Sequence, residues 1–180
     1  MRAYYFDNLP GDQRLPHDFN PSRPVSQETL EAIGVKSWEI PVERYEPKLN
    51  AVAKERDYKN RDTINVSREG MGAIYEEKIK GFFQEHMHED EEIRYILSGS
   101  GFFDVRQAST DEWIRLAVTP GDLIVIPAGI YHRFTLDEAD NIKALRLFKD
   151  EPKWIPHNRG VETDANPYRQ DYLKSIGVGA

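Results

Sequence analysis

Three histidines and one glutamate form a pattern that could bind a metal ion. His86 and His88 are two residues apart, Glu92 follows shortly afterwards, and His132 comes later in the chain. In an extended segment alternate side chains point to the same face, so residues 86, 88 and 92 can converge on one point if the segment stays a regular strand. Taken alone, a histidine pair in so acidic a stretch is more often an exposed turn, so the surrounding elements matter.

Short β-rich runs separated by turn signals surround these residues. Ser98-Gly99-Ser100-Gly101 and Pro120-Gly121-Asp122 are typical of hairpin corners, and no alternation of strands with helices is visible. This pattern favours a jelly-roll-like β-barrel. The expected strands cover residues 93–97, 101–106, 112–118, 122–126, 132–136 and 143–148.

The flanking segments predict a few helices and much loop. After a short strand at 2–6, the proline-rich stretch to residue 25 predicts a loop that wraps the barrel. Ser26 is a good N-cap for a helix that ends at Gly34. Further helices are expected at 48–58, 74–82 and 168–176, whereas the mixed charges between Lys54 and Asp62 are typical of a solvated face or loop.

Composition and charge limit the classes of function. The 180 residues include 39% hydrophobic residues, enough for one core, and no cysteine, so any metal must be held by nitrogen and oxygen. A net charge of −7 disfavours nucleic acid as a partner. No signal peptide and no apolar run of membrane-spanning length is visible, so we expect an intracellular protein without a membrane partner.

Two glycine-containing blocks enclose the candidate ligands. Gly99 follows Glu92 in the first block, and in the second Gly121 precedes Pro127-Ala128-Gly129 and then His132. The two blocks, in this order, resemble the paired signature motifs of the cupin superfamily. The resemblance implies that the metal ligands, which point into a barrel around a divalent ion, are His86, His88, Glu92 and His132.

The cupin resemblance also implies the fold class and domain organisation. We expect a mainly β protein with a few helices, namely a cupin jelly-roll β-barrel with an N-terminal α/β extension and a C-terminal helix. It would form one domain over 1–180, with a wrapping segment at 1–80, the metal-binding core at 81–150 and a tail at 151–180. Two positions depart from the motifs: Gly81 lies one residue closer to His86 than usual, and Leu136 replaces the usual asparagine.

Ligand type alone does not choose the metal. Three imidazoles and one carboxylate suit iron or nickel, and also manganese, cobalt or zinc. Four protein ligands leave two positions of an octahedron open, which is what a bidentate enediolate would need.

A closer resemblance covers nearly the whole chain. Tyr75-Glu76-Glu77-Lys78-Ile79-Lys80, Glu85-His86-Met87-His88, Glu91-Glu92-Ile93-Arg94-Tyr95-Ile96-Leu97 and Pro127-Ala128-Gly129-Ile130-Tyr131-His132-Arg133-Phe134-Thr135 are similar to phrases of the acireductone dioxygenases. The N-terminus, with Pro10-Gly11-Asp12, resembles the eukaryotic members. The likeness is weaker between about residues 43 and 72 and after 159.

This resemblance implies a reaction and a metal. The expected reaction is cleavage of the acireductone 1,2-dihydroxy-3-keto-5-methylthiopentene by O2 in methionine salvage, with one Fe2+ or Ni2+ per chain. The iron form would release formate and 4-methylthio-2-oxobutanoate. The nickel form would release formate, carbon monoxide and 3-methylthiopropionate. The resemblance further implies a cytoplasmic enzyme, with some of it in the nucleus, and we expect a monomer.

Several residues near the ligands are candidates for handling the substrate. Arg94 lies two residues after Glu92 on the same face of an ideal strand, so its guanidinium can meet anionic oxygens near the metal; a surface salt bridge is the alternative. Arg146 is a second candidate, with a structural ion pair as the equal alternative.

The remaining candidates have stronger alternatives. Phe82 and Trp154 could line the pocket around the methylthio group, although aromatic residues in such positions are more often part of the core. Glu91, or else Glu85, could accept a proton from the substrate, and an exposed acidic turn is at least as good an interpretation.

Other functions remain open at this point. A different metal cupin, such as a sugar-phosphate isomerase or another small dioxygenase, would fit the motifs, although a phosphate site calls for more cations near the metal than Arg94 and Arg146. A metal or small-ligand storage module would fit the fold, and an Arg94 that points away from the metal would favour it. An interaction protein with a decayed site is disfavoured because all four ligand positions are filled.

Overall fold

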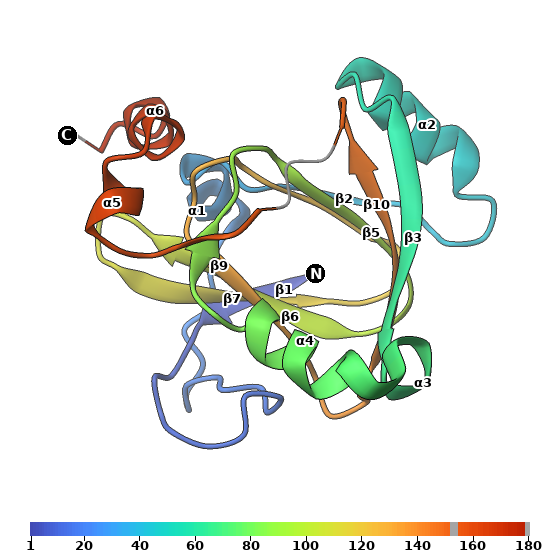
Figure 1. Cartoon of the computed structure of the whole chain (residues 1–180), viewed down its shortest axis with the longest axis horizontal. Coiled ribbons are helices and arrows are strands. Elements are labelled where there is room, and N and C mark those ends of the chain that lie inside the picture. Colours follow the sequence, from blue (N-terminus) through green and yellow to red (C-terminus); the bar gives the residue numbers. More distant parts are fainter. Residues whose placement is uncertain (152–154, 179–180) are drawn as a thin grey trace.

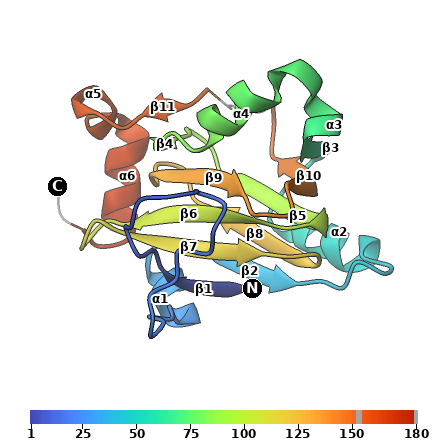
Figure 2. The ribbon, with the colours of Figure 1, turned by 90° about the horizontal axis from the view of Figure 1, so that it is seen from below.

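Two antiparallel sheets face each other in the computed structural model, which describes residues 1–151 and 155–178 (Figures 1 and 2). The first sheet has the strand order β1-β7-β6-β9-β4-β11. Its strands are β1 (Arg2–Tyr5), β4 (His86–Met87), β6 (Gly101–Gln107), β7 (Glu112–Val118), β9 (His132–Leu136) and β11 (His157–Asn158). The second sheet has the order β2-β8-β5-β10-β3. Its strands are β2 (Lys36–Glu39), β3 (Asn60–Ser67), β5 (Glu92–Gly99), β8 (Asp122–Ile126) and β10 (Asn141–Phe148).

Alternation of side chains builds the core between the two sheets. On β6, Phe103 and Val105 point inward, and they meet Ile96 of β5 and Ile124 of β8 in one buried cluster. On β6 the inward residues alternate with the polar Asp104 and Arg106, whereas on β5 and β8 the other face is also apolar and supplies Tyr95, Leu123 and Val125 to a second buried cluster. The mainly β prediction is confirmed, and all six strands expected between residues 93 and 148 are present with ends within two residues.

Helices lie around the sheets. They are α1 (Gln27–Ala32), α2 (Glu46–Glu55), α3 (Arg68–Met71), the 3-10 helix η1 (Gly72–Ile74), α4 (Tyr75–Phe82), α5 (Val161–Asp164) and α6 (Pro167–Ser175). Ser26 caps α1 as expected, since its side chain accepts a hydrogen bond from the backbone N–H of Thr29. The C-terminal helix α6 packs beside α1, and the Tyr172 hydroxyl donates to the carbonyl of Ile33 at 2.6 Å (Figure 1). No helix in the described part of the chain is long and apolar enough to cross a membrane.

The stretch 54–62 is largely exposed, as expected for a solvated face or loop, but its end is a strand and not a loop. After α2 the chain turns at Asp57, which has a positive φ of 64°, and β3 begins at Asn60. Strand β3 is the edge of its sheet, so one face is polar and exposed while Ile64 and Val66 point inward. The last two charged residues of this stretch, Arg61 and Asp62, therefore belong to an edge strand, where charge discourages further pairing. The expected wrapping segment at 1–80 supplies three strands in all, β1, β2 and β3.

A row of charged residues crosses the outer face of the first sheet. Asp104 of β6 lies opposite Arg115 of β7 and Arg133 of β9 in the strand registers. Its carboxylate accepts two hydrogen bonds from Arg115, at 2.7 and 2.9 Å, and one from Arg133 at 2.8 Å. Arg115 also donates to the carbonyls of Gln13 and Leu15, so the row fixes the N-terminal loop on the sheet.

We predict that Asp104→Asn destabilises the protein by about 3 kcal/mol, because removal of one partner leaves buried charge uncompensated. Arg115 is fully buried, so its guanidinium cannot turn to solvent. Urea unfolding followed by fluorescence measures the change. Glu138→Gln, at an exposed carboxylate, is the control with the same change of charge. Equal unfolding midpoints for the two variants would contradict the prediction.

Candidate metal centre and cavity

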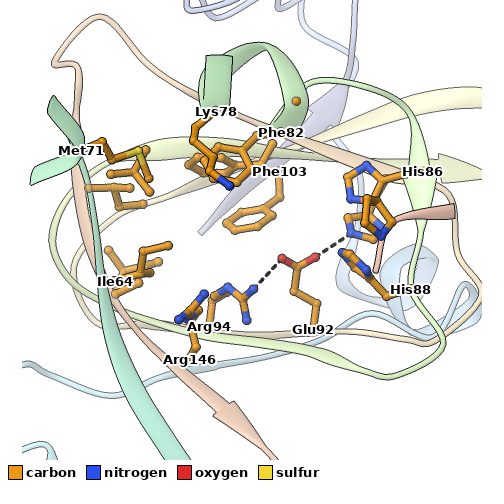
Figure 3. Close-up of a pocket in the computed structure, with 18 of the residues that line it drawn as sticks. Ile64, Met71, Lys78, Phe82, His86, His88, Glu92, Arg94, Phe103 and Arg146 are labelled. Carbon is orange, nitrogen blue, oxygen red and sulfur yellow. Dashed lines mark hydrogen bonds and ion pairs between the residues drawn. The ribbon is translucent and has the colours of Figure 1, made fainter. Parts of the chain in front are cut away.

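The three histidines come together at one end of a cavity between the sheets (Figure 3). His86 and His132 are register partners on β4 and β9. The ring centroids of His86 and His132 are 4.5 Å apart, and those of His88 and His132 are 5.2 Å apart. One ring nitrogen from each histidine lies within 4.8 Å of the other two. Three imidazoles this close are able to share one ion.

Glu92 completes the cluster from the opposite sheet. Its Oε2 lies 2.6 Å from Nε2 of His132, yet neither atom makes a hydrogen bond of acceptable geometry, and both are buried. Buried polar atoms without a hydrogen-bond partner are costly unless an ion or water satisfies them. Their common direction, together with the nitrogen and oxygen donors, fits a divalent metal ion.

Backbone carbonyls orient the imidazole rings. Nδ1 of His86 contacts the carbonyl of Gln84, Nδ1 of His88 lies 3.3 Å from that of Ile155, and Nδ1 of His132 lies 3.0 Å from that of Ile130. A carbonyl can only accept, so each Nδ1 carries the proton and each Nε2 keeps its lone pair. This is the tautomer that metal-binding histidines need.

The ligands do not share one regular strand, which corrects the expectation drawn from their spacing. Strand β4 ends at Met87, the chain turns, and β5 begins at Glu92. The turn carries the chain from one sheet to the other, so the ligands approach the same point from two sides. The backbone N–H of Gly129 donates to the carbonyl of His88 at 3.1 Å, which joins the loop before His132 to the first ligand block. Gly129 has a positive φ of 86°, and a Cβ there would lie 2.4 Å from the carbonyl oxygen of Tyr168.

Burial lowers the pKa of two of the three histidines. Burial, with His132 nearby, lowers the pKa of His86 to about 4, and burial also lowers the pKa of His88. For Glu92, burial acts to raise the pKa, but the Arg94 guanidinium and His132 hold it well below its usual value. His86 and His88 are therefore neutral and Glu92 is ionised at neutral pH, which are the forms that bind metal.

Arg94 lies where its spacing from Glu92 predicts. Its Nη2 donates to Oε1 of Glu92 at 2.9 Å, and its Nη1 donates to the carbonyl of Ile93 at 3.0 Å. The side chain is 13% exposed and lines the cavity. Arg146 of β10 also lines the cavity and is paired with Asp62 of β3.

The rest of the cavity is largely apolar. It has a volume of about 620 Å³, and Phe82, at the end of α4, forms part of its wall as expected. The Phe82 ring contacts Phe134 edge-on with centroids 6.0 Å apart, and Phe134 contacts Phe103 at 4.8 Å. Trp154 lies outside the described residues. Lining residues that the sequence analysis did not single out are Ile64, Val66, Met71, Ile74, Glu77, Lys78, Gly81, Ile96, Phe103, Phe134, Ile142, Ala144 and Pro156.

Strand alternation could have revealed some of these residues. Phe134 is two residues after His132 on β9, and Ile96 is two residues after Arg94 on β5, so each shares a face with a site residue. The residues on α3, η1 and α4 give no such signal, because only the packing of these helices beside the sheets brings them to the cavity.

Glu91 and Glu85 have other partners. Glu91 accepts hydrogen bonds from the Tyr58 hydroxyl at 2.7 Å and from Arg56 at 3.2 Å. Glu85 is paired with Arg106 at 2.8 Å and Arg159 at 2.9 Å. Neither carboxylate is among the described residues that line the cavity. This placement does not favour either one as the proton acceptor, and we leave both out of the proposed catalytic set.

The sequence is similar to a family model and to known relatives. The ARD/ARD' family model matches residues 2–156. The chain belongs to the ARD/ARD' family. It is 68% identical over 180 residues to "Acireductone dioxygenase 1" of Coprinopsis cinerea, with 100% of both chains covered. It is 59% identical over 174 residues to "Acireductone dioxygenase" of Phaeosphaeria nodorum, with 97% of this chain and 96% of the relative covered.

A solved structure shares the fold. "Acireductone dioxygenase from Bacillus anthracis with cadmium ion in active center" superposes with a TM-score of 0.66 at 24% identity, covering 76% of this chain and 92% of the other. The expected cupin barrel is therefore confirmed at the level of the fold.

We predict that the metal-free ARD/ARD' chain loses stability as pH falls from 7 to 5. The pKa of His86 is about 4 in the folded state against the ordinary histidine value of 6.5, so between these values the unfolded chain binds a proton that the folded chain does not. Stability is present above pH 6.5 and is lost as pH falls towards 4. His86 alone accounts for about 2 kcal/mol between pH 7 and 5. Urea unfolding of chelator-treated protein tests this, and a His86→Gln variant with undiminished pH dependence would refute it.

Proposed function

We propose that this member of the ARD/ARD' family is a metal-dependent dioxygenase that cleaves acireductone with O2. The observation that carries the proposal is the convergence of three histidine Nε2 groups and the Glu92 carboxylate beside Arg94 in one cavity. High identity to relatives that bear the name acireductone dioxygenase supports the substrate.

The metal would be held by His86, His88, Glu92 and His132, and we propose Fe2+ or Ni2+. A divalent ion bound there supplies Lewis acidity, which favours the enediolate anion and orients it for reaction with O2. The contribution of the chain is to keep His86 and His88 neutral, to hold the Nδ1 protons on backbone carbonyls and to bury Oε2 of Glu92 and Nε2 of His132.

Arg94 would stabilise negative charge on the substrate. Its guanidinium lies against Glu92, so an anion held near the ligands meets a buried positive charge whose strength water does not screen. Arg146, further along the same wall, would add a second positive charge. The direction of Arg94 also argues against a storage module, which needs no such group beside its metal.

The apolar end of the cavity would accept the methylthio end of the substrate. Phe82 and Phe103 lie on one wall, and Ile64 with Met71 closes the far end (Figure 3). Phe134 contacts both of these phenylalanine rings and lines the same cavity. The charged groups Glu92, Arg94 and Arg146 lie on the opposite wall. A substrate with a polar enediolate head and an apolar thioether tail matches this separation. Lys78 is exposed and lines the cavity from α4, so it is a third cation there, although the apolar lining does not favour a sugar phosphate.

The remaining expectations concern the oligomeric state of the protein and its location in the cell. We propose a monomer in the cytoplasm, with part of the protein in the nucleus, on the strength of the resemblance to eukaryotic members. Size-exclusion chromatography with light scattering and fractionation of cells test these two points.

Arg94→Met is predicted to lower turnover by about a hundredfold, the effect of losing one charge-stabilising donor. Metal content is expected to stay close to that of the wild type, because the metal ligands remain, and the metal-loaded variant should still fold. Steady-state kinetics and elemental analysis give the two readouts. Wild-type turnover in this variant would make Arg94 a structural residue only.

Exchange of the metal is predicted to change the products and leave the fold intact. Apoprotein loaded with Fe2+ should release formate and 4-methylthio-2-oxobutanoate. The same apoprotein loaded with Ni2+ should release formate, carbon monoxide and 3-methylthiopropionate. Product analysis by chromatography and a carbon monoxide assay distinguishes the two. Absence of acireductone consumption with either metal would overturn the proposed function, whereas one common product set would remove only the dependence on metal.

A further inference from the structure

A row of three charged residues crosses the second sheet on the wall of the cavity. In the strand registers Asp62 of β3 lies opposite Arg146 of β10, and Arg146 lies opposite Arg94 of β5. Residues that are directly opposite on neighbouring strands share a face, so these three side chains stand side by side. Figure 3 shows Arg94 and Arg146 next to each other, beyond Glu92.

The neighbouring row on the same face is apolar. Ile64 lies opposite Ala144, and Ala144 lies opposite Ile96. All three line the cavity, as do Arg146 and Arg94. The charged row therefore lies between the apolar end of the cavity and the metal ligands, where the substrate's anionic head would meet its apolar tail.

Arg94 and Arg146, the two positive charges of this row, each have a carboxylate partner. Arg94 is paired with Glu92 at 2.9 Å. Arg146 donates from Nε to Oδ1 and from Nη2 to Oδ2 of Asp62, both at 2.7 Å. Two parallel bonds of this kind fix the plane of a guanidinium, whereas a single bond leaves it free to turn. The Arg146 side chain is 20% exposed and the Asp62 side chain 41% exposed, so the pair owes its strength to its two parallel bonds more than to burial.

We propose that Asp62 is a positioning residue, which holds the Arg146 guanidinium beside Arg94 so that both cations face the anionic head of the substrate. Without Asp62 the two parallel bonds that fix the plane of the Arg146 guanidinium are lost, and no carboxylate offsets the repulsion between the two guanidinium groups at that end of the row. This inference rests on the proposed function for the identity of the substrate. Asp62 itself is not among the described residues that line the cavity, and it acts through Arg146.

A positioning role and a simple field effect predict opposite changes. If Asp62 only weakened the positive field, its removal would strengthen binding of an anion and lower KM. If it positions Arg146, its removal weakens binding although the site becomes more positive. The direction of the change therefore distinguishes the two roles.

The experiment uses the metal-loaded full chain with Asp62→Asn, which keeps the shape of the side chain and removes its charge. We expect KM for acireductone to rise about tenfold, with a smaller change in kcat. The dissociation constant for oxalate, a dianionic chelator measured by calorimetry, should rise similarly. Glu55→Gln, at an exposed carboxylate at the end of α2, is the control with equal charge change and should match the wild type. Asp62→Glu, which keeps the carboxylate, should recover part of the loss.

The double variant tests whether Asp62 acts through Arg146. In an Arg146→Met background, Asp62→Asn should cause no further change in KM or in oxalate affinity. Independent effects of the two substitutions, or an unchanged or lower KM in Asp62→Asn alone, would overturn the inference. If the wild type consumes no acireductone but oxalate binding follows the expected pattern, the proposed function fails and the positioning role of Asp62 stands. If the wild type consumes acireductone and the dissociation constant for oxalate is the same in the wild type and in Asp62→Asn, only the positioning role fails.

Discussion

The buried carboxylate of Glu92 is the group on which the arrangement of the cavity depends. It lies between Nε2 of His132 on one side and the Arg94 guanidinium on the other. An ionised carboxylate away from water is unfavourable unless it is paired, so the fold must bring both positive and metal-binding partners to it. The two sheets meet this requirement together, because Glu92 and Arg94 come from one and His86 and His132 from the other.

Charge and apolar surface are separated within the cavity as a consequence. The second sheet carries Glu92, Arg94 and Arg146 on its inner face, followed by an apolar row that includes Ile64 and Ile96. The first sheet and α4 contribute aromatic rings opposite. A low-dielectric wall facing the ion pairs strengthens their fields, so few charged groups are needed to orient a small anion.

Arginine–carboxylate pairs also stabilise the outer face of the first sheet. There a single carboxylate, Asp104, is shared by Arg115 and Arg133, and Arg115 extends the network to the carbonyls of the N-terminal loop. Arg133 follows His132 directly and therefore points to the opposite face of β9. Packing of Arg133 against the outer layer thus stabilises the strand whose inner face presents His132 to the cavity.

Local patterns in the sequence determined the strands and the metal-binding residue types. Short β-rich runs and glycine turns predicted the strands from β5 to β10, and the spacing of Glu92 and Arg94 predicted that they share a strand face, because these features depend on near neighbours in the chain. Only the tertiary structure decided that His86 and Glu92 approach from opposite sheets, that Asp62 belongs to an edge strand beside Arg146, and that Glu91 pairs with Tyr58 outside the cavity lining. The physical reason is that pairing between distant strands sets these contacts, and a charged residue has the same local pattern whether its partner is water, another ion or a substrate.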